Sequence, residues 1–392
     1  MKKEGVCFMG IIALFSLLLL VAPAVSSGER GVTDSGIKVG AWHDLSGNLT
    51  YYSTSIMNGA GFYFKQVNES GGVNGRKIEY VVYDDGFEPQ RSLAAAKRLV
   101  AQDGVFAFVA PMGTPTTAAV IPYAVENKVP IFGPGLSSHD FTRPVNPYVY
   151  LTAITYYDQM SIGIDFLVKN RGKKKVALFS AGGEIGASCE AGASNRLKKY
   201  GLKIVTHQEA PRDAVDVSAQ ANKIRLDGAD AVIIATQPKP ADLLILECKK
   251  MGYKPDILLY SVLAEPAALQ LKDEDLEGVF GIQPFPAYTG REPGVVEYNN
   301  LLQKYGNNLK SNMFSFWGFI TGKTFVEIVR RMGKDVTVDR FIKTAESLKN
   351  FDTGTGINIS FGPDNHEGAR MAYVVVAKQG KFIKISDWLR AE

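Results

Sequence analysis

Strands and helices alternate along this sequence, and the alternation restricts the fold more than any other feature. Short apolar runs alternate with longer segments that have helical periodicity. In the first part of the chain the predicted strands are 37–41, 77–83, 106–110 and 129–132, and the predicted helices are 54–69, 89–102 and 115–127. Such alternation favours a parallel sheet with helices on both faces.

The same plan starts again after about residue 153. The predicted helices are 157–170, 187–200, 213–227 and 240–251, and the predicted strands are 175–180, 202–207, 229–235 and 256–260. Further on we predict a connection at 283–286, helices at 293–305 and 314–332, and a hairpin of 371–377 and 381–385 around Gln379 and Gly380. Since 392 residues are too many for one ordinary core, we expect an α/β protein with two doubly wound parallel-sheet lobes.

The N-terminus has the pattern of a secretory signal peptide over residues 1–24. Lys2 and Lys3 precede an apolar run, and Ala22-Pro23-Ala24 is a small-x-small cleavage site. A membrane anchor is the alternative, but the run is shorter than the ~20 residues that a spanning helix needs. Cys7 lacks the flanking residues of a lipoprotein site, so we expect secretion to the periplasm without lipidation.

Composition and short motifs argue against several classes of protein. The net charge of +4 is spread without long runs, which gives no sign of a nucleic-acid surface. The four histidines, at 43, 139, 207 and 366, lack metal-ligand spacing, so we expect no metal and no cofactor. Gly318 to Thr324 resembles a phosphate loop but is one residue short, and Gly183 to Gly186 lacks the third glycine of a dinucleotide fingerprint.

Two further features leave alternatives open. Asp84-Asp85 could be a catalytic carboxylate pair, but residues that end a strand before a glycine more often make turn and cap hydrogen bonds. Cys189 and Cys248 could pair in an oxidising compartment, or could simply be small buried residues within helices. We expect a protein that is not an enzyme.

Ligands of open parallel sheets bind beyond the carboxyl ends of the strands. That rule selects the loops 43–53, 84–88, 110–116, 133–139, 181–187, 236–239 and 261–265. In one of them Gly113 permits close approach of the backbone, and Thr114 before Pro115 is a candidate N-cap. The first free amides of that helix would favour a carboxylate. A second glycine and hydroxyl pair, Gly135 and Ser137, follows the next strand.

One segment resembles a known family. Gly71-Gly-Val-Asn-Gly-Arg-Lys-Ile-Glu-Tyr-Val-Val-Tyr-Asp-Asp85 and the helix Ser92-Leu-Ala-Ala-Ala-Lys-Arg-Leu-Val100 are similar to the leucine/isoleucine/valine-binding proteins, the solute-binding proteins of ABC importers. The resemblance implies two lobes joined by three crossovers, which close on a ligand. It implies a first lobe of 35–153 plus 284–370 and a second lobe of 154–283 plus 371–392.

The resemblance also implies a set of ligand-binding positions. In the first lobe they fall on Tyr52, Thr114, Gly135 and Ser137, with Met112 and Gly113 beside them and the late aromatic on Phe314. In the second lobe they fall on Ile185, Gln237 and Ser261. Ile185 replaces a tyrosine of the family, and Ser261 stands near the place of an acid that pairs with the ammonium of an amino acid.

These departures shape the expected ligand. Because a buried ammonium needs a partner charge, the serine favours a ligand that keeps a carboxylate and lacks an α-ammonium. We therefore expect a monomeric periplasmic protein that captures an aliphatic or aromatic organic acid and delivers it to an inner-membrane ABC permease. The alternatives are a binding protein for branched-chain or other amino acids, a ligand sensor subunit of a membrane receptor, and a secreted enzyme.

Overall fold

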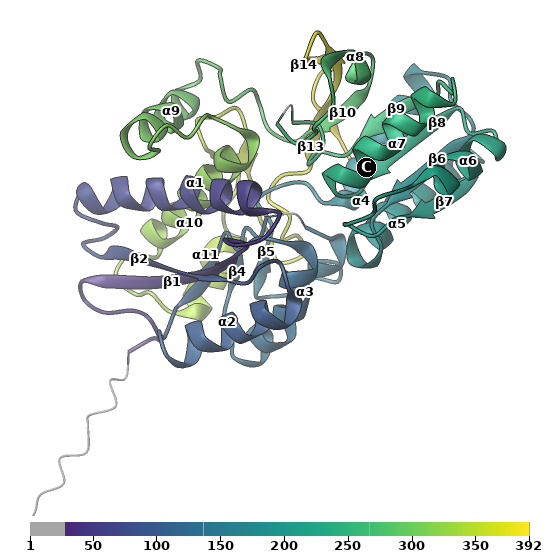
Figure 1. Ribbon diagram of the computed structural model, residues 1–392. Coiled ribbons are helices and arrows are strands. Elements are labelled where there is room, and N and C mark those ends of the chain that lie inside the picture. The colour runs from purple at the N-terminus through teal and green to yellow at the C-terminus, as the bar shows by residue number, and fades with distance from the viewer. Residues whose placement is uncertain (1–27, 136, 266, 392) are drawn as a thin grey trace, which may run out of the picture.

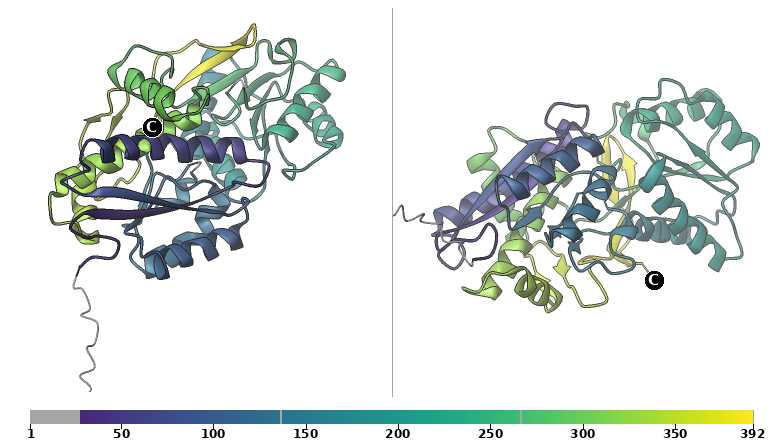
Figure 2. Two further views of the ribbon diagram at one scale, coloured as in Figure 1. Left: turned by 60° about the vertical axis from the view of Figure 1, so that its left-hand side comes forward. Right: turned by 90° about the horizontal axis from the view of Figure 1, so that it is seen from below.

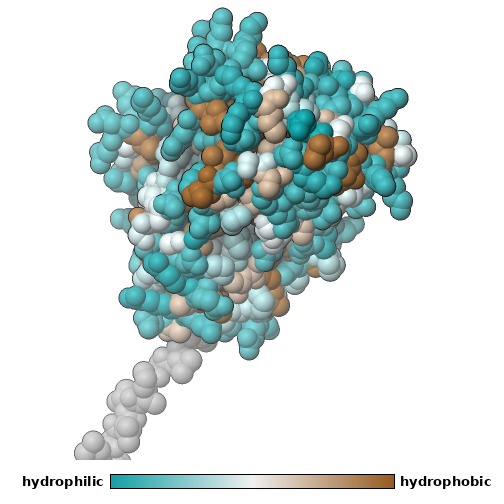
Figure 3. All heavy atoms as spheres, turned by 45° about the vertical axis from the view of Figure 1, so that its right-hand side comes forward, coloured by the Kyte–Doolittle hydropathy of each residue, from teal (hydrophilic) through white to brown (hydrophobic). Residues whose placement is uncertain are grey.

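Two α/β lobes make up the chain over residues 28–391, which the structure, a computed structural model, describes apart from Leu136 and Pro266 (Figure 1). The predicted signal peptide and Cys7 lie outside the described residues. Within the described ranges, no helix has the length and apolarity needed to cross a lipid bilayer. The face shown in Figure 3 is mainly hydrophilic, with hydrophobic side chains in small groups.

The first lobe contains a parallel sheet of strand order β2-β1-β3-β4-β5. Its strands are β1 (Gly36–His43), β2 (Lys77–Asp84), β3 (Ala107–Val109), β4 (Ile131–Phe132) and β5 (Val149–Tyr150). All four strands predicted for this region are confirmed. The short β5 was not predicted, because two residues carry no readable periodicity.

Helices cover both faces of this sheet (Figures 1 and 2). They are α1 (Thr50–Glu69), α2 (Pro89–Ala101), α3 (Thr114–Glu126), α10 (Met313–Met332) and α11 (Val338–Glu346). Helix α9 (Pro293–Tyr305) packs against α1 on the side away from the sheet. Side chains alternate between two cores as strand geometry requires: Val39 and Val109 belong to the core shared with α1 and α10, whereas Trp42 and Phe108 belong to the core under α2 and α3.

The second lobe has a mixed sheet of strand order β14-β13-β10-β9-β8-β6-β7, with β15 paired to β13. Its strands are β6 (Val176–Ser180), β7 (Thr206–Glu209), β8 (Ala231–Ala235), β9 (Asp256–Leu259), β10 (Phe280–Gln283), β13 (Met371–Lys378), β14 (Lys381–Lys384) and β15 (Leu389–Arg390). Strands β6 to β10 pair in parallel, as predicted for this lobe, and β13 runs antiparallel to β10 and β14 at one end of the sheet. The predicted hairpin is confirmed, and Gln379 and Gly380 have the positive φ angles of its turn.

The helices of the second lobe are α4 (Tyr156–Asp165), α5 (Gly183–Lys199), α6 (Ser218–Leu226), α7 (Pro238–Lys250) and α8 (Asp273–Leu276). A π-helical turn, Phe166–Asn170, continues α4, and a two-stranded sheet of β11 (Phe351–Asp352) and β12 (Asn358–Ile359) follows α11. The predicted helix 213–227 was wrong at its start, because the Asp216 carboxylate accepts the N–H of Ser218 and ends the preceding turn there. Cys189 and Cys248 are buried free thiols and do not pair.

A close crossing of α1 and α10 positions one wall of the region between the lobes. A Cβ atom on Gly59 would overlap the carbonyl oxygen of Ser315, and one on Gly318 would overlap the carbonyl of Ile56. The glycines let the two backbones touch. The glycine pattern that resembled a phosphate loop, Gly318 to Thr324, is therefore part of a buried helix crossing.

We expect Gly318→Ala to destabilise the protein by about 1–3 kcal/mol, because the methyl group would force the two helices apart. The free energy of unfolding in urea measures this. Gly61→Ala on α1 is the matched control, since its Cβ would meet only the ring of Tyr80 at 3.8 Å and alanine favours a helix. Equal effects of the two substitutions would contradict a role for the close crossing.

Candidate ligand-binding site

The two lobes touch across the cleft that separates the ends of their strands. The hydroxyl of Tyr52 donates to the carbonyl oxygen of Ala268 at 3.4 Å, and the N–H of Met313 donates to the Glu265 carboxylate at 3.4 Å. At the rim, the guanidinium of Arg212 lies 2.8 Å from the carboxylate of Glu88. These cross-cleft contacts describe a closed arrangement of the lobes.

Two first-lobe loops are held rigid by aspartates. The carboxylate of Asp44 accepts the N–H groups of Gly47 and Leu49 at 2.5 and 2.8 Å. Asp84 accepts the N–H of Leu45, and Asp85 accepts the N–H of Phe87 at 2.9 Å. The interpretation of Asp84-Asp85 as turn and cap residues is confirmed.

Helix α3 begins at the cleft with a glycine that no other residue could replace without strain. Gly113 has φ +106° and is the N-cap, so the prediction that Thr114 caps the helix was wrong. A Cβ on Gly113 would lie 2.6 Å from the ring of Phe87. Thr114 is instead the first helical residue, and its buried hydroxyl hydrogen-bonds the hydroxyl of Tyr156 at 3.1 Å.

The other predicted polar positions make hydrogen bonds within their own lobes. The carbonyl oxygen of Gly135 accepts the N–H of Gly113 at 3.1 Å, and the hydroxyl of Ser137 donates to the carbonyl of Pro134 at 2.9 Å. In the second lobe, the backbone N–H of Ser261 donates to the side-chain oxygen of Gln159 at 3.0 Å. The side chains of Ser137 and Ser261 are both buried.

Tyr52 packs its ring within the first lobe and connects the two lobes through its hydroxyl. It was predicted in a loop but lies in the first turn of α1, which begins four residues before the predicted start. Its ring meets the buried ring of Phe314 edge to face, with the centroids 4.7 Å apart. Burial raises the pKa of the Tyr52 hydroxyl, so this group stays protonated at neutral pH and acts as a donor.

Both lobes enclose a small apolar cavity of about 10 Å³, which we call the inner cavity. Its lining consists of Leu49, Tyr52, Phe87, Met112, Ile185, Gln237, Pro238, Tyr260 and Val262. A space of this size holds about one water molecule, so a ligand can enter only if the lobes separate. All but one of the lining side chains are apolar or aromatic.

The structure brings together four of the predicted site residues around the inner cavity. They are Tyr52, Met112, Ile185 and Gln237. Gly113, Thr114, Gly135, Ser137 and Ser261 do not line it, and Phe314 lies behind Tyr52. Ile185 and Gln237 were predicted in loops, whereas Ile185 lies in the first turn of α5 and Gln237 is the N-cap residue of α7.

Several lining residues were not predicted individually. Phe87 and Val262 lie in strand-end loops that the sequence selected, and Tyr260 follows directly after β9. The rule for strand ends could have identified these three. The contact between Thr114 and Tyr156 had no sequence signal, because it joins two elements that only the closed fold brings together.

Comparisons with known proteins agree with this architecture. A family model described as periplasmic binding protein matches residues 36–381. The Leu/Ile/Val-binding protein homolog 7 of Brucella abortus (strain 2308) is 22% identical over 385 residues, which cover 93% of this chain and 96% of that protein.

Two solved structures share the fold. A fatty acid ABC transporter substrate-binding protein from Thermomonospora curvata superposes with a TM-score of 0.82 at 23% identity, covering 93% of this chain and 95% of that one. A branched-chain amino acid ABC transporter protein from Thermus thermophilus with bound valine has a TM-score of 0.82 at 20% identity, covering 91% and 97%. The chain therefore belongs to the periplasmic binding protein family, in its leucine/isoleucine/valine-binding group.

Proposed function

We propose that this protein captures a small carboxylate-bearing molecule with an aliphatic or aromatic body and delivers it to an ABC permease. The observation that carries the proposal is the inner cavity, which both lobes enclose and which apolar side chains line almost completely. An apolar body fits such a lining, and burying it favours the closed form. The protein needs no catalytic group for this function.

The names of the two structural neighbours support the same ligand class. One is described as a fatty acid binding component and the other was solved with valine. Both molecules contain a carboxylate and an aliphatic body, and valine carries an α-ammonium in addition. Branched-chain amino acids are therefore the principal competitors to simple organic acids as ligands of this chain.

The start of α3 is the proposed site for the carboxylate. Its first amides point out of a helix of 13 residues, so the positive end of the helix dipole favours an anion there. The hydroxyl of Thr114, the first residue of that turn, is the proposed side-chain donor. In the closed structure the Thr114 hydroxyl contacts the hydroxyl of Tyr156. We propose that the carboxylate of an entering ligand accepts a hydrogen bond from the Thr114 hydroxyl.

Thr114→Ala should weaken binding of the best carboxylate ligand by about 1–3 kcal/mol, the usual cost of a lost hydrogen bond to a charged group. A thermal-shift screen of aliphatic acids, aromatic acids, amides and amino acids identifies the ligand, and calorimetry measures its affinity.

Thr54→Ala is the matched control, because the Thr54 hydroxyl bonds only the carbonyl of Thr50 within α1 among the described residues. Unchanged affinity of Thr114→Ala would reject the carboxylate site. A screen in which no compound with a carboxylate stabilises the protein would reject the proposed ligand class.

We propose that the lobes move about three crossovers, near 150–156, 283–286 and 370–371. This assigns 35–153 plus 284–370 to the first lobe and 154–283 plus 371–392 to the second. The course of the sheets supports the division, since β5 ends at Tyr150, β10 ends at Gln283 and β13 begins at Met371. Opening about these segments would expose the inner cavity.

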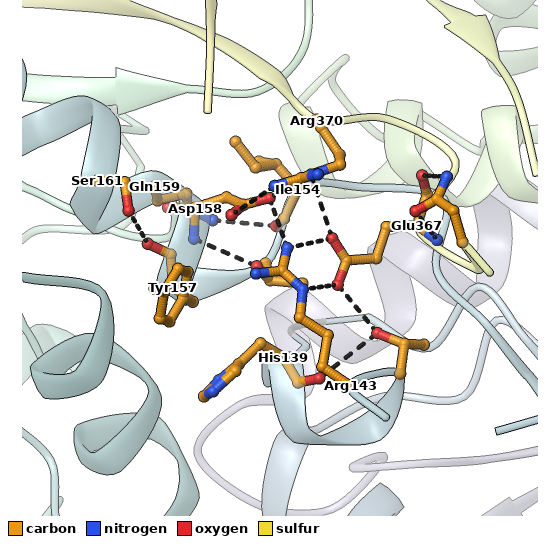
Figure 4. A network of polar contacts seen from close by, with 12 residues as sticks. His139, Arg143, Ile154, Tyr157, Asp158, Gln159, Ser161, Glu367 and Arg370 are labelled. Carbon is orange, nitrogen blue, oxygen red and sulfur yellow. Dashed lines mark hydrogen bonds and ion pairs between the residues drawn. The ribbon is translucent and has the colours of Figure 1, made fainter. Parts of the chain in front are cut away.

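A network of two carboxylates and two arginines lies beside the first and third crossovers (Figure 4). Asp158 of α4 lies 2.9 Å from the guanidinium of Arg143 and 2.8 Å from that of Arg370. Glu367 accepts from Arg143 at 2.5 and 2.8 Å and from the Thr142 hydroxyl at 3.0 Å. Both carboxylates are almost fully buried, so each depends on the arginines for compensation.

Asp158→Asn should lower the free energy of unfolding by about 1–3 kcal/mol. This is less than the full cost of stranding a buried charge, because the side chains of Arg143 and Arg370 remain 32% and 30% exposed. The network links the lobes in the closed arrangement, so the variant should also bind its ligand more weakly.

Asp165→Asn is the matched control on the same helix. Asp165 pairs with Arg196 inside the second lobe, so its loss should lower stability without changing ligand affinity. Urea unfolding and calorimetry on both variants give the two readouts. An Asp158→Asn protein that binds ligand as tightly as the wild type would contradict a role of the network in closure.

A further inference from the structure

A second, larger cavity lies next to the inner cavity, and we call it the outer cavity. It has a volume of about 610 Å³ and is lined by residues of both lobes. Leu49, Tyr52, Gln237 and Pro238 line both cavities, so the two are neighbours. A ligand whose apolar body occupies the inner cavity would extend its other end into the outer cavity.

Asp242, in the second turn of α7, lines the outer cavity with an oxygen that has no described partner. Its Oδ2 atom accepts the backbone N–H of Gln270 at 3.0 Å. Its Oδ1 atom is buried, and no group within residues 28–135, 137–265 or 267–391 hydrogen-bonds to it. Burial raises the pKa of Asp242 to about 6, although the Gln270 N–H opposes the shift. A buried carboxylate oxygen without a donor is unfavourable, so a donor from a ligand would stabilise it.

The other charged groups of the outer cavity differ from Asp242. Both carboxylate oxygens of Asp44 accept backbone N–H groups of their own loop. Arg212 pairs with Glu88 across the rim. Asp213 and Lys239 are exposed to solvent. Of these acids, Asp242 is the one that has a buried oxygen without a hydrogen-bond donor among the described residues.

We propose that the ligand carries a protonated nitrogen at the end remote from its carboxylate, and that Asp242 binds this nitrogen in the outer cavity. This inference rests on the proposed function, which puts the carboxylate at the start of α3. Met112, two residues before Thr114, lines the inner cavity only, whereas Asp242 lines the outer cavity only. The apolar inner cavity therefore separates the two charged sites.

The separation defines the chemical class of the ligand. An α-amino acid carries its ammonium one carbon away from its carboxylate, too near to span an apolar spacer. A carboxylic acid with an amino group at the far end of an aliphatic chain meets both requirements. Asp242 then supplies the charge partner that Ser261, a buried serine whose N–H is already bonded to Gln159, does not provide.

Paired probes of equal chain length test the inference by calorimetry. The simple acids are butanoate, hexanoate and octanoate, and their partners are 4-aminobutanoate, 6-aminohexanoate and 8-aminooctanoate. Norleucine, with six carbons and an α-ammonium, tests the competing position of the nitrogen. We expect at least one terminal-amino acid to bind wild-type protein tenfold or more tightly than the simple acid of equal length and than norleucine.

Asp242→Asn should abolish that tenfold preference and leave the affinity for the simple acid unchanged. Asparagine keeps an oxygen for the N–H of Gln270, so the fold is preserved. Asp213→Asn is the matched control, since it removes the same charge from the exposed side of the same cavity and should keep the preference.

Three outcomes overturn the inference. They are equal affinities of the simple and terminal-amino acids, a stronger preference for norleucine, and a preference that survives Asp242→Asn. In each of these cases carboxylates still bind, so the proposed function stands. If none of the seven probes and no acid of the thermal-shift screen binds, the proposed function itself fails.

Discussion

Parallel pairing of the strands is the constraint on which the rest of the structure depends. Because β1, β3 and β4 run in one direction in the first sheet, and β6, β8 and β9 do so in the second, their following loops gather at one edge of each sheet. The two edges face one another across the cleft. The residues that line the inner cavity lie in loops that follow parallel strands, including Phe87 after β2 and Leu49 before α1, or in the first turns of α1, α5 and α7.

The cleft is apolar at its centre, which excludes water, and polar at its margins, where charged groups of the two lobes meet. A closed centre excludes water, so its side chains are apolar and its tyrosine hydroxyls find carbonyl or hydroxyl partners. The margins carry charges that meet across the lobes, Glu88 with Arg212 at the rim and Asp158 with Arg143 beside the crossovers. The rim pair is exposed and contributes little, whereas the buried carboxylate beside the crossovers requires its arginines.

The alternation of strands and helices was sufficient to predict the lobes and the loops at the cleft, because periodicity is a local property. The strand-end rule selected the loops 181–187 and 236–239, and the family resemblance placed ligand-binding positions on Ile185 and Gln237 within them; both residues line the inner cavity. Helix starts were less predictable. Thr114 has the sequence of an N-cap, yet Gly113 takes that position because its φ of +106° brings the chain against Phe87 and Gly135.

Contacts between distant segments had no local signal. The antiparallel pairing of β10 with β13 joins residues far apart in sequence, and so does the bond between Thr114 and Tyr156. The Asp242 carboxylate, whose Oδ1 has no hydrogen-bond partner in the described part of the chain, is held through Oδ2 by Gln270 of a neighbouring loop. Such features arise from packing, and a single sequence does not encode them in a readable pattern.

Closure of the two lobes on a ligand is the central claim, and small-angle X-ray scattering tests it most directly. The ligand-free protein should have a larger radius of gyration than the closed structure, because the inner cavity of about 10 Å³ admits no ligand until the lobes separate. Saturation with the tightest-binding carboxylate should reduce the radius to that of the closed structure. A scattering profile that stays unchanged when calorimetry shows the site to be filled would contradict closure.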